Sequence, residues 1–126
     1  MIKFRDNSHE ENFYNILSRM RRNDPYHRSA AYLMALVPMC PEDVFSFETD
    51  CVIFHGLYAG LQSSSSRRAT RLMHNLWNGT YMDRTADEPA KTACYYAIDN
   101  IMDNHEYFPW FVEAIRIRFE WDEFDD

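Results

Sequence analysis

The sequence has few residues that interrupt regular structure and few that could cross-link it. It contains three glycines and five prolines, and this shortage of chain-breaking residues favours helices over a turn-rich β fold. The cysteines Cys40, Cys51 and Cys94 are odd in number and widely spaced, which argues against a disulfide framework and a zinc site. We therefore expect them to be small residues of the core.

Long apolar runs are also missing. No stretch approaches the ~20 residues that a membrane-spanning helix needs, and Pro38 interrupts the most apolar one. Residues 1–6 contain no apolar signal region, so we expect a cytoplasmic protein without membrane contact. A chain of 126 residues corresponds to one domain and is long enough to bury a core without cross-links.

Acidic side chains outnumber basic ones and are concentrated near the C-terminus. The net charge is −7; residues 1–82 carry nine basic and eight acidic side chains, and residues 83–126 carry four and twelve. This balance disfavours broad contacts with a nucleic-acid backbone but leaves room for a local basic patch in the first two thirds.

The spacing of apolar residues predicts an all-α fold. A first helix is expected to begin at a capping box formed by Ser8 and Glu11. Further helices are predicted at 26–37, 41–47, 66–78, 89–102 and 107–119. The helix at 26–37 is apolar almost all round, which is typical of a buried helix.

The remaining segments complete the predicted architecture. Residues 51–54 are β-branched and aromatic, so we expect at most one short extended segment there. We predict one compact domain of five to six short helices at 1–119, followed by an acidic aromatic tail at 120–126. The last helix is expected to turn five apolar residues inward: Phe108, Phe111, Val112, Ile115 and Phe119.

A run of serines followed by arginines is the first candidate site. A helix N-terminus offers free N–H groups, and guanidinium groups clamp anions, so Ser65, Ser66, Arg67, Arg68 and Arg71 form a candidate anion-binding site. The anion would be a phosphate, a nucleic-acid backbone or an acidic protein surface. The alternative is a capped helix with a solvated or salt-bridged basic face.

The acidic tail is the second candidate site. Aromatic anchors within an acidic rim are typical of protein-binding surfaces. The alternative is that the tail folds back onto the preceding helix. The partner-binding candidates are Trp121, Asp122, Glu123, Phe124, Asp125 and Asp126.

Catalytic and metal-binding signatures are weak. The five histidines are His9, His27, His55, His74 and His105, and no two are four residues apart. Neither a nucleophile motif nor an unexplained carboxylate pair is present. We therefore predict no catalytic residue, metal or cofactor, although a site assembled in space stays open.

Four stretches that follow one another over nearly the whole chain are Phe4-Arg5-Asp6 with His9, Asp24-Pro25-Tyr26-His27-Arg28, Arg67-Arg68-Ala69-Thr70-Arg71-Leu72 and Tyr107-Phe108-Pro109-Trp110-Phe111. In these stretches the chain resembles a small family of bacterial proteins known only as a domain of unknown function, found in Firmicutes and on mobile elements. The resemblance implies no activity.

Three hypotheses for the function follow. The leading one is a protein-binding module, in the form of an anti-CRISPR-like inhibitor encoded by a phage or mobile element, whose acidic surface blocks a basic site of a host nuclease or defence complex. The second is a binder of nucleic acid or an anionic ligand through the arginine-rich helix start. The third is a small enzyme with a spatially assembled site.

Overall fold

Two aspartates set the starts of the first two helices in a computed structural model of the chain, which describes residues 1–103 and 106–120. Helix α1 (Asn7–Arg19) begins behind Asp6, whose carboxylate accepts a hydrogen bond from the backbone N–H of His9 at 2.8 Å. The predicted capping box at Ser8 is wrong, because Asp6 supplies the cap two residues earlier. Helix α2 (Pro25–Leu36) begins behind Asp24 in the same way, with Pro25 in its first turn.

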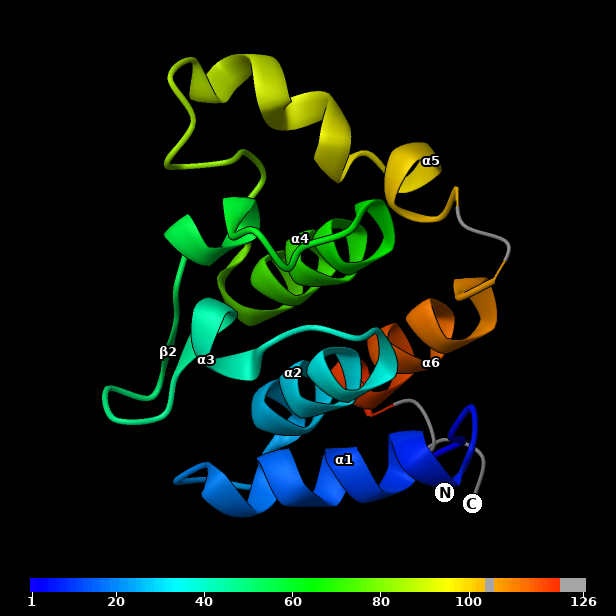
Figure 1. Cartoon of the computed structure of the whole chain (residues 1–126). Coiled ribbons are helices and arrows are strands. Elements are labelled where there is room, and N and C mark those ends of the chain that lie inside the picture. Colours follow the sequence, from blue (N-terminus) through cyan, green and yellow to red (C-terminus); the bar gives the residue numbers. More distant parts are fainter. Residues whose placement is uncertain (104–105, 121–126) are drawn as a thin grey trace.

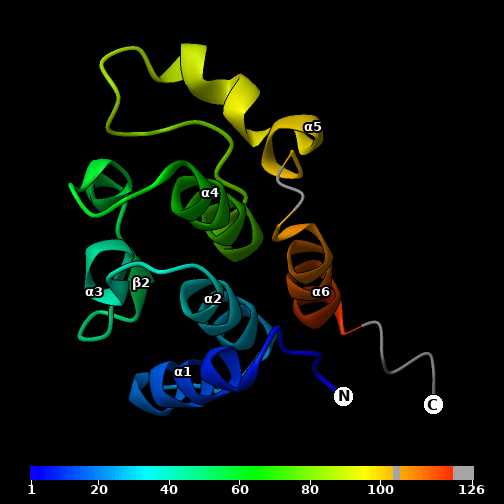
Figure 2. The same ribbon diagram turned by 45° about the vertical axis from the view of Figure 1, so that its right-hand side comes forward.

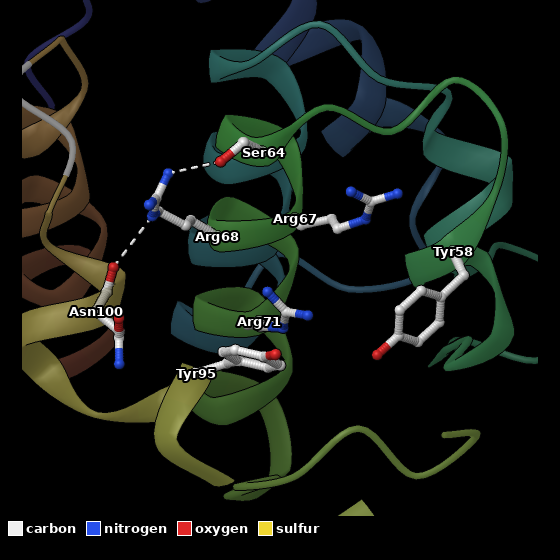
Figure 3. A pocket seen from close by; sticks show the side chains of 7 residues that line it. All are labelled: Tyr58, Ser64, Arg67, Arg68, Arg71, Tyr95 and Asn100. Carbon is white, nitrogen blue, oxygen red and sulfur yellow. Dashed lines mark hydrogen bonds between the residues drawn. The ribbon is translucent and has the colours of Figure 1, made fainter. Parts of the chain in front are cut away.

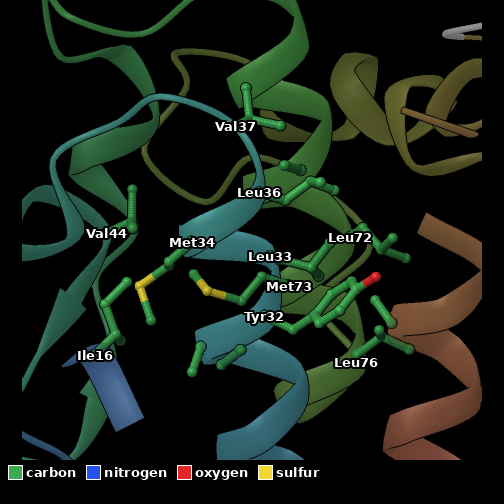
Figure 4. Packing of buried hydrophobic residues seen from close by; sticks show 14 of the residues in the cluster. Ile16, Tyr32, Leu33, Met34, Leu36, Val37, Val44, Leu72, Met73 and Leu76 are labelled. Atoms are coloured by element: carbon green, nitrogen blue, oxygen red, sulfur yellow. The ribbon is translucent and has the colours of Figure 1, made fainter. Parts of the chain in front are cut away.

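Helix α2 is the centre of the fold. It packs against α1 on one side, α4 (Ser64–Asn78) on another and α6 (Phe108–Phe119) on a third (Figures 1 and 2). Its predicted burial is confirmed, since Ala31, Tyr32 and Leu33 are completely enclosed. The apolar side chains of α2 meet Ile16 of α1 and the Leu72, Met73 and Leu76 stripe of α4 (Figure 4).

A short connection between α2 and α4 contains the small sheet. Helix α3 (Pro41–Val44) ends at Val44 rather than at the predicted residue 47, because the chain there extends into β1 (Phe45–Ser46). Strand β1 pairs antiparallel with β2 (Cys51–Val52), and the 3₁₀ helix η1 (His55–Tyr58) follows. Gly56 of η1 lies so close to α3 that a Cβ atom there would be 1.5 Å from the carbonyl oxygen of Asp43.

Helix α4 has the clearest ends in the chain. Ser63 is its N-cap and forms a reciprocal capping box with Ser66. At the other end Gly79 adopts the left-handed conformation, with φ of 78°, that commonly terminates helices. The helix therefore starts two residues before the predicted position 66 and ends at the predicted residue.

The segment at 89–102 is not one helix. It divides into the 3₁₀ helix η2 (Pro89–Tyr96) and the short α5 (Ile98–Ile101), both of which pack against α4. Hydrogen bonding of Thr92 contributes to this geometry: its hydroxyl donates to the carbonyl of Pro89 at 2.6 Å and accepts from the backbone N–H of Asp83 at 2.7 Å.

The predicted burial of side chains in the last helix was partly wrong. Helix α6 turns Phe111, Ala114 and Ile117 inward, and three of the expected inward residues, Phe108, Val112 and Phe119, are exposed. Aromatic and aliphatic residues occupy both faces of this helix, so its apolar stripe was ambiguous.

The cysteines also lie outside the core. Cys51 and Cys94 are exposed and Cys40 is half-buried. Cys51 belongs to the outward face of the two-residue strand β2, and its neighbour Val52 takes the buried position.

The predominantly helical fold is confirmed, with one two-stranded sheet in the described part of the chain. Among residues 1–103 and 106–120, none of the helices combines the length and the apolar character that crossing a bilayer requires.

Candidate anion-binding site

Asp83 is a buried carboxylate that ties three helices together. It lies in the loop after α4, and its side chain is fully enclosed. Arg71 of α4 donates to it twice, from Nε at 3.2 Å and from a terminal nitrogen at 2.9 Å. The hydroxyls of Tyr58 from η1 and Tyr96 from η2 donate to the same carboxylate, the latter at 2.7 Å. One side chain therefore fixes η1, α4 and η2 relative to one another.

These contacts keep both Asp83 and Arg71 charged. Burial alone would raise the pKa of Asp83, but the hydrogen bonds from Arg71, Tyr58 and Tyr96 outweigh it and hold that pKa below its usual range. Burial opposes the charge of Arg71 in turn, and the bonds to Asp83 overcome it and raise its pKa. Arg71 therefore forms a salt bridge with Asp83.

Tyr58 and Arg71 of this network also line a hollow of about 490 Å³. Figure 3 shows the side chains that surround it. We call it the arginine hollow, because the first two turns of α4 supply its cationic wall. Tyr58 of η1 closes one side, and η2 with α5 closes the other. Its lining residues are Tyr58, Ser64, Arg67, Arg68, Arg71, Tyr95 and Asn100.

Two of the three arginines keep an unbalanced charge. Arg67 donates through Nε to the carbonyl of Leu57 at 3.2 Å, and Arg68 donates to Asn100 O at 3.1 Å and to Ser64 Oγ at 2.8 Å. All of these acceptors are neutral. Within residues 1–103 and 106–120, neither arginine forms an ion pair, and both terminal nitrogens of Arg67 are without a hydrogen-bond acceptor. Because Asp83 balances Arg71, the hollow retains a net charge of about +2.

The serines take different places from those that the sequence suggested. Ser64 lines the arginine hollow. Ser66 is completely buried, and its hydroxyl is bound within the capping box and to the amide oxygen of Gln62. Ser65 is half-buried and does not line the hollow. The anion would therefore lie along the flank of α4 rather than at its N-terminal end.

His74 lies three residues beyond Arg71 on α4, in the protein interior. It is 1% exposed, and its ring meets Phe54 edge-on at 5.1 Å. Within the described residues, neither of its ring nitrogens has a hydrogen-bond partner. Burial lowers the pKa of His74 to about 4, so the ring is neutral at physiological pH.

Two other buried histidines, His9 and His27, form structural contacts. His27 is buried, with Nδ1 2.6 Å from Asp24 and Nε2 2.8 Å from Asp50, and so ties α2 to the turn of the β hairpin. His9 contacts the carbonyl of Tyr32 at 3.0 Å. Across 1–103 and 106–120, no cluster of three His, Cys, Asp or Glu side chains is arranged to hold a metal ion.

A comparison with protein-family models shows which family the chain belongs to. A model described as a family of unknown function (DUF6075) matches residues 1–125. The chain belongs to this family. No curated protein and no solved structure matches it.

The second predicted site is the acidic tail. Trp121, Asp122, Glu123, Phe124, Asp125 and Asp126 all lie outside the described residues.

Sequence reasoning identified the arginines but missed their surroundings. Asp83, Tyr58, Tyr95 and Asn100 come from loops and short helices in which no periodicity marks a functional face. A lone aspartate twelve residues after Arg71 carries no motif, and only the fold brings the two together. The cluster of aromatic residues around 95–96 was the one available signal.

Proposed function

We propose that this protein binds a phosphate-bearing small molecule in the arginine hollow. The observation that carries the proposal is the pair Arg67 and Arg68, whose charges are uncompensated within the described chain although both side chains are held in place by neutral acceptors. A guanidinium group whose terminal nitrogens are free, as those of Arg67 are in the described chain, matches the geometry of phosphate oxygens.

Hydrogen bonds within the chain hold the arginine side chains of the hollow in place. Arg68 is held from both sides, by Ser64 and Asn100, and Arg71 is held by Asp83 and stacked 4.5 Å above the ring of Tyr95. A preorganised site loses less conformational entropy on binding than a set of free surface arginines. This supports a binding site over a solvated basic face.

Size and charge favour a small ligand over a polymer. The hollow volume of about 490 Å³ falls in the range typical of small-molecule sites. The net charge of −7 would repel a long polyanion, whereas the local charge of the hollow acts on a single phosphate group at close range.

The proposal is tested by titrating the protein with inorganic phosphate at constant ionic strength and following backbone amide signals by NMR. We expect saturable shifts centred on α4. The variant Arg67→Ala/Arg68→Ala should bind at least about tenfold more weakly, since each charge-assisted hydrogen bond contributes about 1.5–3 kcal/mol.

The matched control is Arg22→Ala/Lys91→Ala. Both of these side chains are exposed and lie outside the hollow, and the control changes the net charge by the same amount. Binding should survive in the control. Unsaturable shifts in the wild-type protein, or equal losses in both variants, would refute the proposal. Far-UV circular dichroism verifies that each variant retains its helices.

The leading hypothesis from the sequence stays a prediction. An anti-CRISPR-like inhibitor would act through residues 121–126, outside the described chain, and its target would be a host nuclease or defence complex. The expected origin in Firmicutes and mobile elements and the expected cytoplasmic location are predictions as well.

A further inference from the structure

The arginine hollow has aromatic walls as well as cationic ones. Tyr58 is 47% exposed and Tyr95 is 45% exposed, and both rings line the hollow beside the arginines (Figure 3). Aromatic rings next to arginines are the usual platform on which proteins stack a nucleobase, because every base presents a flat π face.

The two rings differ in how much of their surface is free. The guanidinium of Arg71 lies 4.5 Å over the ring of Tyr95 and covers one face of it. Over the ring of Tyr58, the cation recorded in the described chain is Arg67, at 5.9 Å from the ring centroid, which is the outer limit of a cation–π contact. The hydroxyl of Tyr58 is bound to Asp83, which fixes the position of the ring, and about half of the residue is exposed.

On the basis of the proposed phosphate site, we infer that the ligand is a nucleoside monophosphate whose base stacks on Tyr58. In this arrangement the base lies against Tyr58 and the phosphate against the arginine side chains of α4, of which Arg67 points toward η1 and Arg68 toward Asn100 (Figure 3). The arginines of the hollow would bind the phosphate of such a molecule, and the exposed ring of Tyr58 would bind its base.

The charge of the hollow favours a monophosphate over a triphosphate. A phosphate monoester carries about −1.5 to −2 at neutral pH, which matches the two uncompensated arginines. A triphosphate would bring excess negative charge into a protein that is already at −7.

The first test compares adenosine 5′-monophosphate with ribose 5-phosphate on the wild-type protein by isothermal titration calorimetry. The two probes share the sugar and the phosphate, so their difference reports the base. We expect the nucleotide to bind at least about 5-fold more tightly, which corresponds to about 1 kcal/mol of stacking. Equal dissociation constants would overturn the inference and leave the phosphate site standing. If neither probe binds, the inference and the proposed function both fail.

Two substitutions locate the stacking. Tyr58→Leu should remove the preference for the nucleotide, while Tyr58→Phe should keep it, because the ring remains and only the bond to Asp83 is lost. The affinity for ribose 5-phosphate should be similar in both variants. A nucleotide preference that survives in Tyr58→Leu would overturn the assignment to this ring. The comparison on the wild-type chain needs neither variant to fold.

The same chemistry also occurs at the 5′ end of a nucleic-acid strand. A 5′-phosphorylated dinucleotide separates the two sources. We expect it to bind no more tightly than the mononucleotide, because the hollow is small and the protein is acidic. Tighter binding of the dinucleotide would overturn the free mononucleotide as the ligand.

Discussion

His74 makes the stability of the fold depend on pH in a way that can be calculated. Its buried ring has a pKa of about 4 in the folded protein, against 6.5 for an exposed histidine. The unfolded chain therefore takes up this proton first when the pH falls. A lowered histidine pKa thus contributes stability that is fully present above about pH 6.5 and is lost as the pH falls toward 4.

The size of the effect follows from the two pKa values. A difference of about 2.5 units corresponds to about 3 kcal/mol over the whole titration, because one unit is worth 1.36 kcal/mol. Between about pH 7.5 and pH 5, the predicted loss is about 2 kcal/mol. This is a large share of the 5–15 kcal/mol that stabilises a typical domain.

The assay is urea unfolding of the wild-type protein and of His74→Phe, followed by circular dichroism at both pH values. Phenylalanine keeps a ring next to Phe54 and removes the titrating group. Burial also lowers the pKa of His9, but this residue is present in both proteins and cancels in their difference. The advantage of the variant over the wild type should grow by about 2 kcal/mol on going to pH 5. A constant difference between the two proteins would refute the reasoning.

Three further predictions concern other parts of the molecule. Gly56→Ala should cost at least about 1–3 kcal/mol in urea unfolding because its Cβ atom would overlap the backbone of α3, whereas Gly60→Ala, which meets nothing within 4 Å in the described chain, should be close to neutral. Asp83→Asn should cost about 3 kcal/mol, since it strands the largely buried Arg71, and adding Arg71→Leu should recover part of the loss. Deleting residues 121–126 should abolish capture of a host protein by a tagged chain if the tail is the partner-binding surface; retained capture would eliminate that hypothesis.

The parts of the fold that could be predicted are those whose structure depends only on residues close together in the sequence. Pro25, Pro41 and Gly79 each stand at a helix end for reasons of backbone geometry, and the structure has helix ends at all three. The burial of α2 followed from an apolar surface with no polar side. Such signals need no knowledge of the neighbouring elements.

The predictions that were wrong concern residues whose environment is set by distant parts of the chain. Helix α6 carries apolar side chains on both faces, and only its packing against α2 decides that Phe111 is buried and Phe108 exposed. Glu113 is buried because it pairs with Arg116 at 2.6 Å and accepts from the backbone N–H of Lys3 at 2.8 Å, a contact across 110 positions. The spacing of apolar residues along the sequence gives no information on a contact between residues so far apart.

The candidate site shows the same division between local and distant causes, and this division explains its charge. The three arginines share one side of α4 because of helical spacing, so the sequence alone groups them. Which of them remains available is decided by Asp83, which neutralises Arg71 and leaves Arg67 and Arg68 without a counter-charge in the described chain. The same carboxylate binds the hydroxyls of Tyr58 and Tyr96, so the residue that lowers the charge of the hollow also fixes its aromatic wall. Enclosing this carboxylate carries a desolvation cost, which the hydrogen bonds from Arg71, Tyr58 and Tyr96 offset while they hold the three helices together. If the proposed function holds, Asp83 therefore sets both the charge of the hollow and the position of Tyr58 for an anionic ligand.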